Sequence, residues 1–153
     1  QPIVRTVRKM DPRIFSPDLM NLRGDLLDLD LSHRVAFDPA RDLLFLNFEA
    51  LNVRRIEDVK AIDEAVTNVC AKIGRKVSVV VNYDSFELAS DLAEEYADMV
   101  RSLEERFYSR VSRYTTSAFM RVKLGQLLSR SVQPHIFESR AEAQAFHEMT
   151  SDL

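Results

Sequence analysis

Two short polar segments contain the residue types that do chemistry in α/β proteins. The first consists of Asn82, Asp84 and Ser85, directly after the apolar run 79–81. In open α/β sheets, ligands bind beyond the carboxyl ends of parallel strands, where this segment is expected to lie. Asp84 could orient the Ser85 hydroxyl, or Ser85 could accept a phosphoryl group. The alternative, a turn, is the one we favour, because Asn, Asp and Ser side chains readily bond their own backbone.

The second segment precedes an expected helix and combines guanidinium groups with hydroxyls. Its members are Arg113, Thr115, Thr116, Ser117 and, one turn further on, Arg121. The N–H groups at a helix N-terminus attract anions, and arginine offers a fork that fits phosphate or carboxylate. These five residues are therefore candidates for an anion site. The alternative is a capped helix with a solvated basic face, which we again favour.

Other sites for catalysis or metals are not indicated. The only possible soft or imidazole ligands are scattered without metal-ligand spacing: Cys70, His33, His135 and His147. Three glycines are too few for a phosphate-binding loop. Cys70 lies beside a helical apolar stripe and is expected to be a core thiol, whereas His135 is expected to be a structural or surface residue. We expect no catalytic residue, metal or cofactor in this chain.

Composition limits the class of protein. The chain has 153 residues, of which 46% are hydrophobic and 29% charged, so it can form one domain with a proper core. A net charge of −3 argues against nucleic acid or an anionic membrane as a partner. One cysteine suits a reducing compartment, and no apolar run approaches the roughly 20 residues that span a bilayer. We therefore expect a cytoplasmic protein.

The start of the chain differs from the rest. It begins with Gln1, and the first part holds three of the five prolines with little periodicity. We expect residues 1–31 to be a linker that packs on a single α/β domain formed by residues 32–153. The chain is thus expected to be the C-terminal part of a larger protein.

The apolar period alternates between that of strands and that of helices. We expect a β-hairpin within 34–48, strands at 76–81, 111–115 and 134–137, and helices at 56–73, 90–108, 117–129 and 140–149. Asp91 and Glu94 have the spacing of a capping box. Strands alternating with helices pair in parallel, so the prediction is a single mixed sheet with an N-terminal antiparallel hairpin followed by αβαβαβα.

Four stretches together resemble the C-terminal region of bacterial acyl-CoA:acetate/3-ketoacid CoA-transferase-like proteins. They are 46–49 with Leu51, 81–86, 113–121 with 123–125, and 134–139. The resemblance extends from about Pro12 onward. It implies a parent protein that moves coenzyme A between carboxylic acids, with coenzyme A as its substrate.

The resemblance also implies where catalysis takes place. In such enzymes a glutamate in a Glu-Asn-Gly setting attacks the acyl-CoA. Here Glu49 is followed by Ala50 and Leu51, so we do not assign it that role. The nucleophile is then expected upstream, and this chain is an accessory domain whose partner is the catalytic domain of the same chain. Homo-oligomer formation stays open.

The predicted element order is also similar to that of STAS domains, the fold of anti-sigma factor antagonists. Those domains carry a phosphorylatable serine after a central strand, and Ser85 holds a comparable place. Phe86 and Glu87 follow it in place of that family's Ser-Gly pattern. The alternative function is therefore a STAS-like regulatory or protein-binding module.

Overall fold

The predicted mixed sheet is present in the structure, a computed structural model that describes residues 31–128 and 135–151. Its strands are β2 (Val35–Asp38), β3 (Leu43–Asn47), β5 (Val77–Asn82), β7 (Tyr108–Tyr114) and β8 (Ile136–Phe137), adjacent in that order. Strand β2 is antiparallel to β3, and all other neighbours are parallel. The α/β class and the N-terminal antiparallel pair are confirmed. The predicted linker lies almost wholly outside the described residues and stays a prediction.

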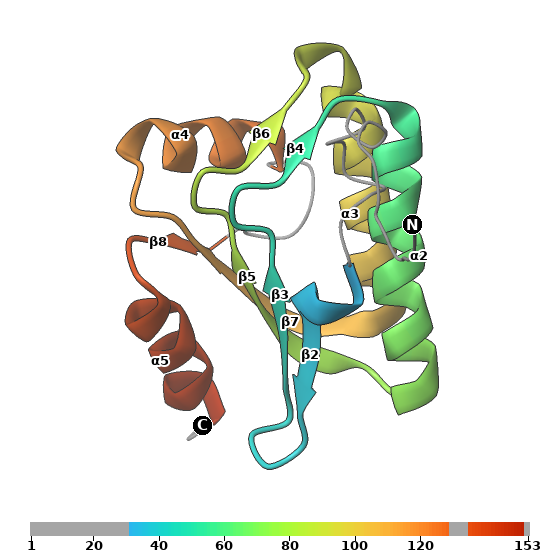
Figure 1. Ribbon diagram of the computed structural model, residues 1–153. Helices are drawn as coiled ribbons and strands as arrows, with labels where there is room; N and C mark the ends of the chain where they lie inside the picture. The colour runs from blue at the N-terminus through green and yellow to red at the C-terminus, as the bar shows by residue number, and fades with distance from the viewer. Residues whose placement is uncertain (1–30, 129–134, 152–153) are drawn as a thin grey trace, which may run out of the picture. The chain divides into compact units, whose positions relative to one another are not determined.

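Helices cover both faces of this sheet (Figure 1). Helices α2 (Ile56–Ile73) and α3 (Ala93–Phe107) lie together on one face, and α5 (Arg140–Ser151) lies on the other. Helix α4 (Ala118–Leu127) lies near the carboxyl ends of the parallel strands, in the upper part of Figure 1. Side chains alternate between the two faces along each strand, so each strand contributes to two apolar layers. The central strand β5 is buried at Val77, Val79, Val80 and Val81 for this reason.

Helix α2 follows its sequence pattern closely. Val59, Ile62, Val66 and Cys70 are buried along one stripe. At the N-terminus, the Asp58 carboxylate accepts hydrogen bonds from the backbone N–H groups of residues 54 and 55. At the other end Gly74 has a φ of 80°, a left-handed conformation that glycine adopts without strain. These local signals are why both helix ends match the prediction.

The region around α3 differs from the prediction in two respects. The Asp91–Glu94 capping box is wrong, because a 3-10 turn, η3 (Ser90–Leu92), precedes the helix and its N-cap is Leu92, which makes no side-chain cap. Strand β7 begins at Tyr108, three residues before the predicted start. Tyr108 pairs with Val77 of β5, so β7 starts earlier than the polar sequence of this segment indicates.

A second, two-stranded parallel sheet was not predicted. It pairs β4 (Asn52–Val53) with β6 (Glu87–Leu88). These strands follow β3 and β5 along the chain and continue above the main sheet in Figure 1. Two residues are too few for an apolar period, so the sequence could not indicate them. Helix α4 begins one residue later and ends two residues earlier than predicted, and helix α5 begins where predicted.

Candidate functional site

Three loops meet at the carboxyl end of the parallel sheet. They follow β3, β5 and β7, and backbone hydrogen bonds join each to its neighbour. Ala50 N donates to Asp84 O, and Tyr83 N donates to Tyr114 O, both at 2.9 Å. The two predicted polar segments therefore lie side by side, as expected from the topology.

The Asn82 loop is a turn held by its own side chains. The Oδ1 atom of Asn82 accepts from the Asp84 backbone N–H at 2.9 Å. Phe86 N donates to Tyr83 O, and within this turn Ser85 is exposed with a φ of 57°. The Nδ2 group of Asn82 donates to Asn47 at 3.2 Å and to the Glu49 carboxylate at 3.3 Å. The turn geometry that we favoured from the sequence is present.

The Asp84 carboxylate does not contact the Ser85 hydroxyl. Its Oδ1 atom accepts from the backbone N–H of Thr116 at 2.6 Å and from the Thr116 hydroxyl at 3.1 Å. The N–H and hydroxyl groups of Thr116, which were candidates for an external anion, are thus bound to a carboxylate of the protein itself. Asp84 ties the β5 loop to the loop that leads into α4.

The other polar groups before α4 also bond within the protein. The Ser117 hydroxyl accepts from Met120 N at 3.1 Å and caps α4. The Thr115 hydroxyl is buried and accepts from Ser117 N at 3.3 Å. Arg121 donates to the Thr115 carbonyl at 2.8 Å and lies 3.8 Å from the Glu138 carboxylate. The structure brings these residues together as a capped helix start.

Arg113 is not part of that cluster, so its predicted position is wrong. It points to the opposite face of the sheet, toward α3, and is 1% exposed. There its guanidinium donates to the Glu104 carboxylate at 2.7 Å. Because Ser112 and Tyr114 face α5, strand alternation directs Arg113 into the other layer. A buried charge of this kind requires a partner, and Glu104 supplies it.

Tyrosines surround this buried ion pair. The hydroxyls of Tyr83 and Tyr96 are 2.7 Å apart. Burial raises the pKa of Tyr83, while the charge of Arg113 and the bonds to Tyr96 and Arg113 oppose that shift. Burial likewise raises the pKa of Tyr96 well above its usual value. Both tyrosines therefore stay neutral and act as hydrogen-bonding members of the core.

The open polar space at this end of the sheet lies on the α5 side. A cavity of about 220 Å³ is lined by residues from β3, β5, β7 and the start of α5. Its polar side chains are Asn47, Glu49, Asn82, Tyr114 and Arg140. Of these, the sequence pointed only to Asn82 as a candidate. Strand ends in register could have indicated Asn47, because it pairs with Asn82 across parallel strands.

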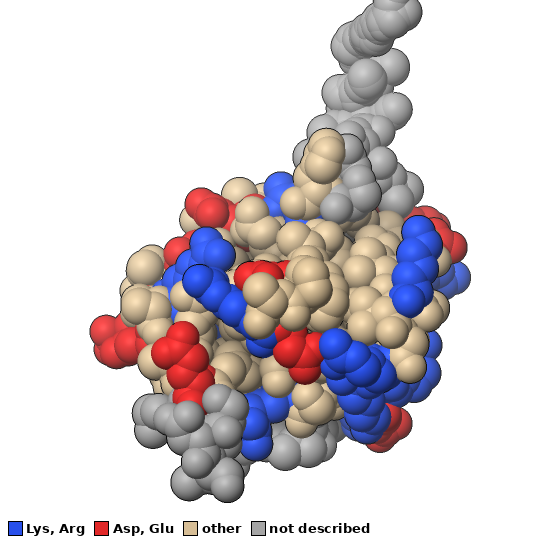
Figure 2. All heavy atoms as spheres, turned by 90° about the horizontal axis from the view of Figure 1, so that it is seen from below, with Lys and Arg blue, Asp and Glu red and all other residues tan. Residues whose placement is uncertain are grey.

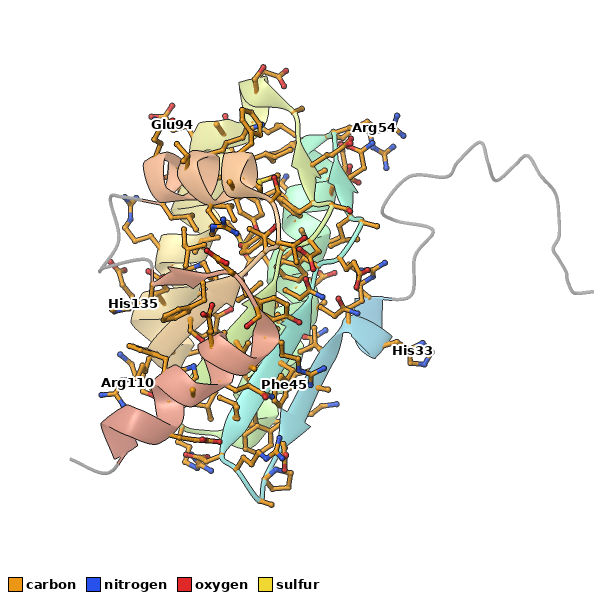
Figure 3. All side chains as sticks on the ribbon, turned by 90° about the vertical axis from the view of Figure 1, so that its left-hand side faces the viewer. His33, Phe45, Arg54, Glu94, Arg110 and His135 are labelled. Carbon is orange, nitrogen blue, oxygen red and sulfur yellow. The ribbon has the colours of Figure 1, made fainter. Side chains whose placement is uncertain are left out.

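The start of α5 positions Arg140 at this cavity. Ser139 Oγ accepts from Glu142 N at 3.2 Å and fixes the first turn of the helix. The Arg140 guanidinium lies 5.0 Å from the centre of the Phe45 ring, a cation–π contact. Figure 3 shows the sheet from this side, with Phe45 on β3 next to α5.

A serine and a histidine also meet, under α5. Ser112 Oγ is 2.9 Å from His147 Nε2, and both residues are buried. The same Nε2 atom is 3.1 Å from the Val79 carbonyl, which can only accept, so Nε2 carries the proton. Ser112 Oγ donates to the Ala143 carbonyl at 2.9 Å. A histidine that donates toward the serine does not activate it as a base, so this pair anchors α5 to the sheet.

Two further residues behave as structural groups. Cys70 is buried, as predicted, and burial raises the pKa of its thiol to about 11, partly offset by Arg106. The His135 ring packs against the Phe146 ring in a tilted arrangement, with ring centres 4.4 Å apart. Partial burial and then Arg113 and Arg110 lower the pKa of His135.

The surface at the other end of the sheet shows mixed charge. In Figure 2, Asp and Glu side chains lie among the Lys and Arg side chains. The hairpin turn contributes to this pattern, since Arg75 pairs with Asp42 and Arg41 lies 3.8 Å from Asp38.

Within residues 31–128 and 135–151, no group of three or more His, Cys, Asp or Glu side chains is placed to hold a metal ion. No helix described here has the length and apolar character needed to cross a bilayer. Comparisons with protein family models, with curated proteins and with solved structures found no match to this chain.

Proposed function

We propose that this chain is a non-catalytic accessory domain of a CoA-transferase-like protein. Its resemblance to the C-terminal region of those proteins motivates the parent activity. In this proposal the upstream part of the same protein carries the nucleophilic glutamate and binds coenzyme A. The chain described here packs on that catalytic part or regulates it.

The observation that supports a non-catalytic role is how the reactive groups are bonded. The Asp84 carboxylate holds Thr116, and the Glu104 carboxylate holds Arg113. The His147 imidazole donates rather than accepts at Ser112. Each of these contacts joins two elements of the fold. General bases and nucleophiles must instead present their reactive atoms to a substrate.

The test of the parent activity uses the full-length protein. We expect the complete open reading frame to encode a glycine-rich region with a Glu-Asn-Gly setting before this chain. The purified full-length protein should form acetyl-CoA from an acyl-CoA and acetate. Loss of that activity on changing the upstream glutamate to glutamine supports the proposal. A full-length protein without CoA transfer contradicts it.

A second candidate, the STAS-like switch, rests on Ser85. This serine is exposed on the loop that follows the central strand, and no hydrogen bond to its hydroxyl is found within the described residues. A hydroxyl in this position is accessible to a kinase. Mass spectrometry of protein isolated from its own cells should find phosphate on Ser85 if this candidate holds. Unmodified Ser85 under all growth conditions favours the accessory-domain proposal.

A further inference from the structure

The cavity beside α5 carries two opposite charges that do not neutralise each other. Arg140 and Glu49 both line it. Among the described residues, Arg140 takes part in no ion pair, and its guanidinium lies over the Phe45 ring. The Glu49 carboxylate accepts one hydrogen bond, from the amide of Asn82. A protein that places a cation and an anion around one cavity without pairing them can bind a ligand between them.

A tyrosine also lines this cavity. Tyr114 lines it, and this residue is only 9% exposed. No described residue forms a hydrogen bond with the Tyr114 hydroxyl. Burial raises the pKa of Tyr114, the charge of Arg140 lowers it, and Asp84 and Glu49 raise it. The Tyr114 hydroxyl is therefore free to form a hydrogen bond with a ligand in the cavity.

The backbone holds these groups in place. Arg34 donates to the carbonyls of Asn47 and Glu49 at 3.0 and 2.8 Å, which fixes the loop after β3. Within this loop, the Asn47 amide oxygen accepts a hydrogen bond from the backbone N–H of Glu49 at 3.2 Å. Ala50 takes a left-handed φ of 61° and completes the turn. These hydrogen bonds hold the loop that carries Glu49 in one conformation, as a preformed binding site requires.

From this geometry we propose that the cavity binds a small zwitterion of the α-amino acid class, an inference that goes beyond the proposed function and does not depend on it. The ligand carboxylate binds the Arg140 guanidinium and accepts from the Tyr114 hydroxyl. The ligand ammonium donates to the Glu49 carboxylate, which accepts only one hydrogen bond from the described residues. Charge-assisted bonds at both ends favour a molecule that carries both charges.

Size and charge exclude the other obvious ligands. The volume of about 220 Å³ is below the roughly 300–1,000 Å³ of sites for drug-sized molecules, so coenzyme A does not fit within it. A simple carboxylate leaves Glu49 as a like charge beside it, which disfavours binding. A simple amine would place its positive charge beside the like charge of Arg140, which also disfavours binding.

The experiment is an NMR titration of the whole 15N-labelled chain. Each common L-amino acid is added in turn up to about 10 mM, a range that detects millimolar affinity. Acetate and ethylamine, each with one of the two charges, are added at the same concentration. We expect at least one amino acid to shift the backbone amides of Asn47, Asn82, Tyr114 and Arg140, and the two single-charge probes to leave them unchanged.

Three variants test the assignment of roles. Arg140→Gln and Glu49→Gln should each weaken binding of that amino acid by about tenfold or more, because each removes one charge-assisted bond. Both side chains are exposed, so the fold should tolerate the changes. Lys72→Gln removes an exposed charge on α2, away from the cavity, and should leave binding unchanged.

Three results contradict the proposal. In the first, no amino acid shifts these amides at the highest concentration. In the second, acetate shifts them as strongly as the amino acids do and Glu49→Gln strengthens its binding, which identifies a plain anion site. An equal effect of Lys72→Gln and Arg140→Gln also contradicts the assigned contact.

Discussion

Asp84 and Thr116 join the two segments that the sequence singled out. Asp84 Oδ1 accepts from the Thr116 backbone N–H at 2.6 Å and from its hydroxyl at 3.1 Å. The carboxylate thus binds the Thr116 groups that were candidates for an external anion. The residue types suited to ligand binding here hold two loops of the sheet together.

Removing this carboxylate should destabilise the protein. Asp84→Ala leaves the Thr116 N–H without its acceptor, and we expect the free energy of unfolding to fall by roughly 1–3 kcal/mol. Asp84→Asn should cost less, because its amide oxygen can still accept. Urea denaturation measures both. Asp91→Ala, at an exposed position in η3, is the control, and an Asp84→Ala variant as stable as that control contradicts this role.

Local sequence signals predicted some elements well and others poorly, and α2 shows why. Its apolar stripe and Gly74 act within the helix itself, so the sequence contains all that is needed to find both ends. The capping box at Asp91 failed because a buried Leu92 and a 3-10 turn determine how the chain enters α3. Packing decided that start, and packing is not visible in a local pattern.

The candidate site shows the same division. Asn82 could be found because polar residues after a buried strand lie at the carboxyl end of the sheet. Arg113 was misplaced because its partner Glu104 comes from a neighbouring helix. Arg140 and Tyr114 meet only after α5 packs on β7, so no spacing in the sequence connects them.

The buried pair of Arg113 and Glu104 should be sensitive to loss of one partner. Arg113→Met leaves Glu104, 12% exposed, without its cation, and we expect a loss of about 3–5 kcal/mol in the free energy of unfolding. The double variant Arg113→Met, Glu104→Met should be more stable than this single variant, because no buried charge remains.

The matched control for that experiment is Arg101→Met. Arg101 forms an exposed ion pair with Asp98 at 2.8 Å, and such pairs contribute at most about 1 kcal/mol. Chemical denaturation of the three variants and the wild type gives the comparison. If Arg113→Met is no more destabilising than Arg101→Met, the buried pair is not a structural element of the core.

Acid should weaken the attachment of α5. Burial lowers the pKa of His147, and Arg110 and His135 add to this shift, while its bond to the Val79 carbonyl opposes it. The unfolded chain therefore binds a proton at a higher pH than the folded one. The stabilising contribution is complete above the unfolded pKa of about 6.5 and is lost as the pH falls toward the lower folded value.

Denaturation at about pH 7.5 and at about pH 5, on either side of that unfolded pKa, tests this effect. The wild type should be less stable at the lower pH, and His147→Gln should reduce that difference. His33→Gln, at an exposed position, should keep it. A His147→Gln variant with the full wild-type difference shows that other groups cause the acid sensitivity.

The central claim is that this chain contributes no catalysis of its own, and a CoA-transfer assay on the isolated chain tests it most directly. The chain is incubated with an acyl-CoA and acetate, and acetyl-CoA is followed by chromatography, with Glu49→Gln measured in parallel. We expect acetyl-CoA to stay at the background level for both proteins. Turnover by the wild type that disappears in Glu49→Gln contradicts the claim and makes Glu49 the nucleophile.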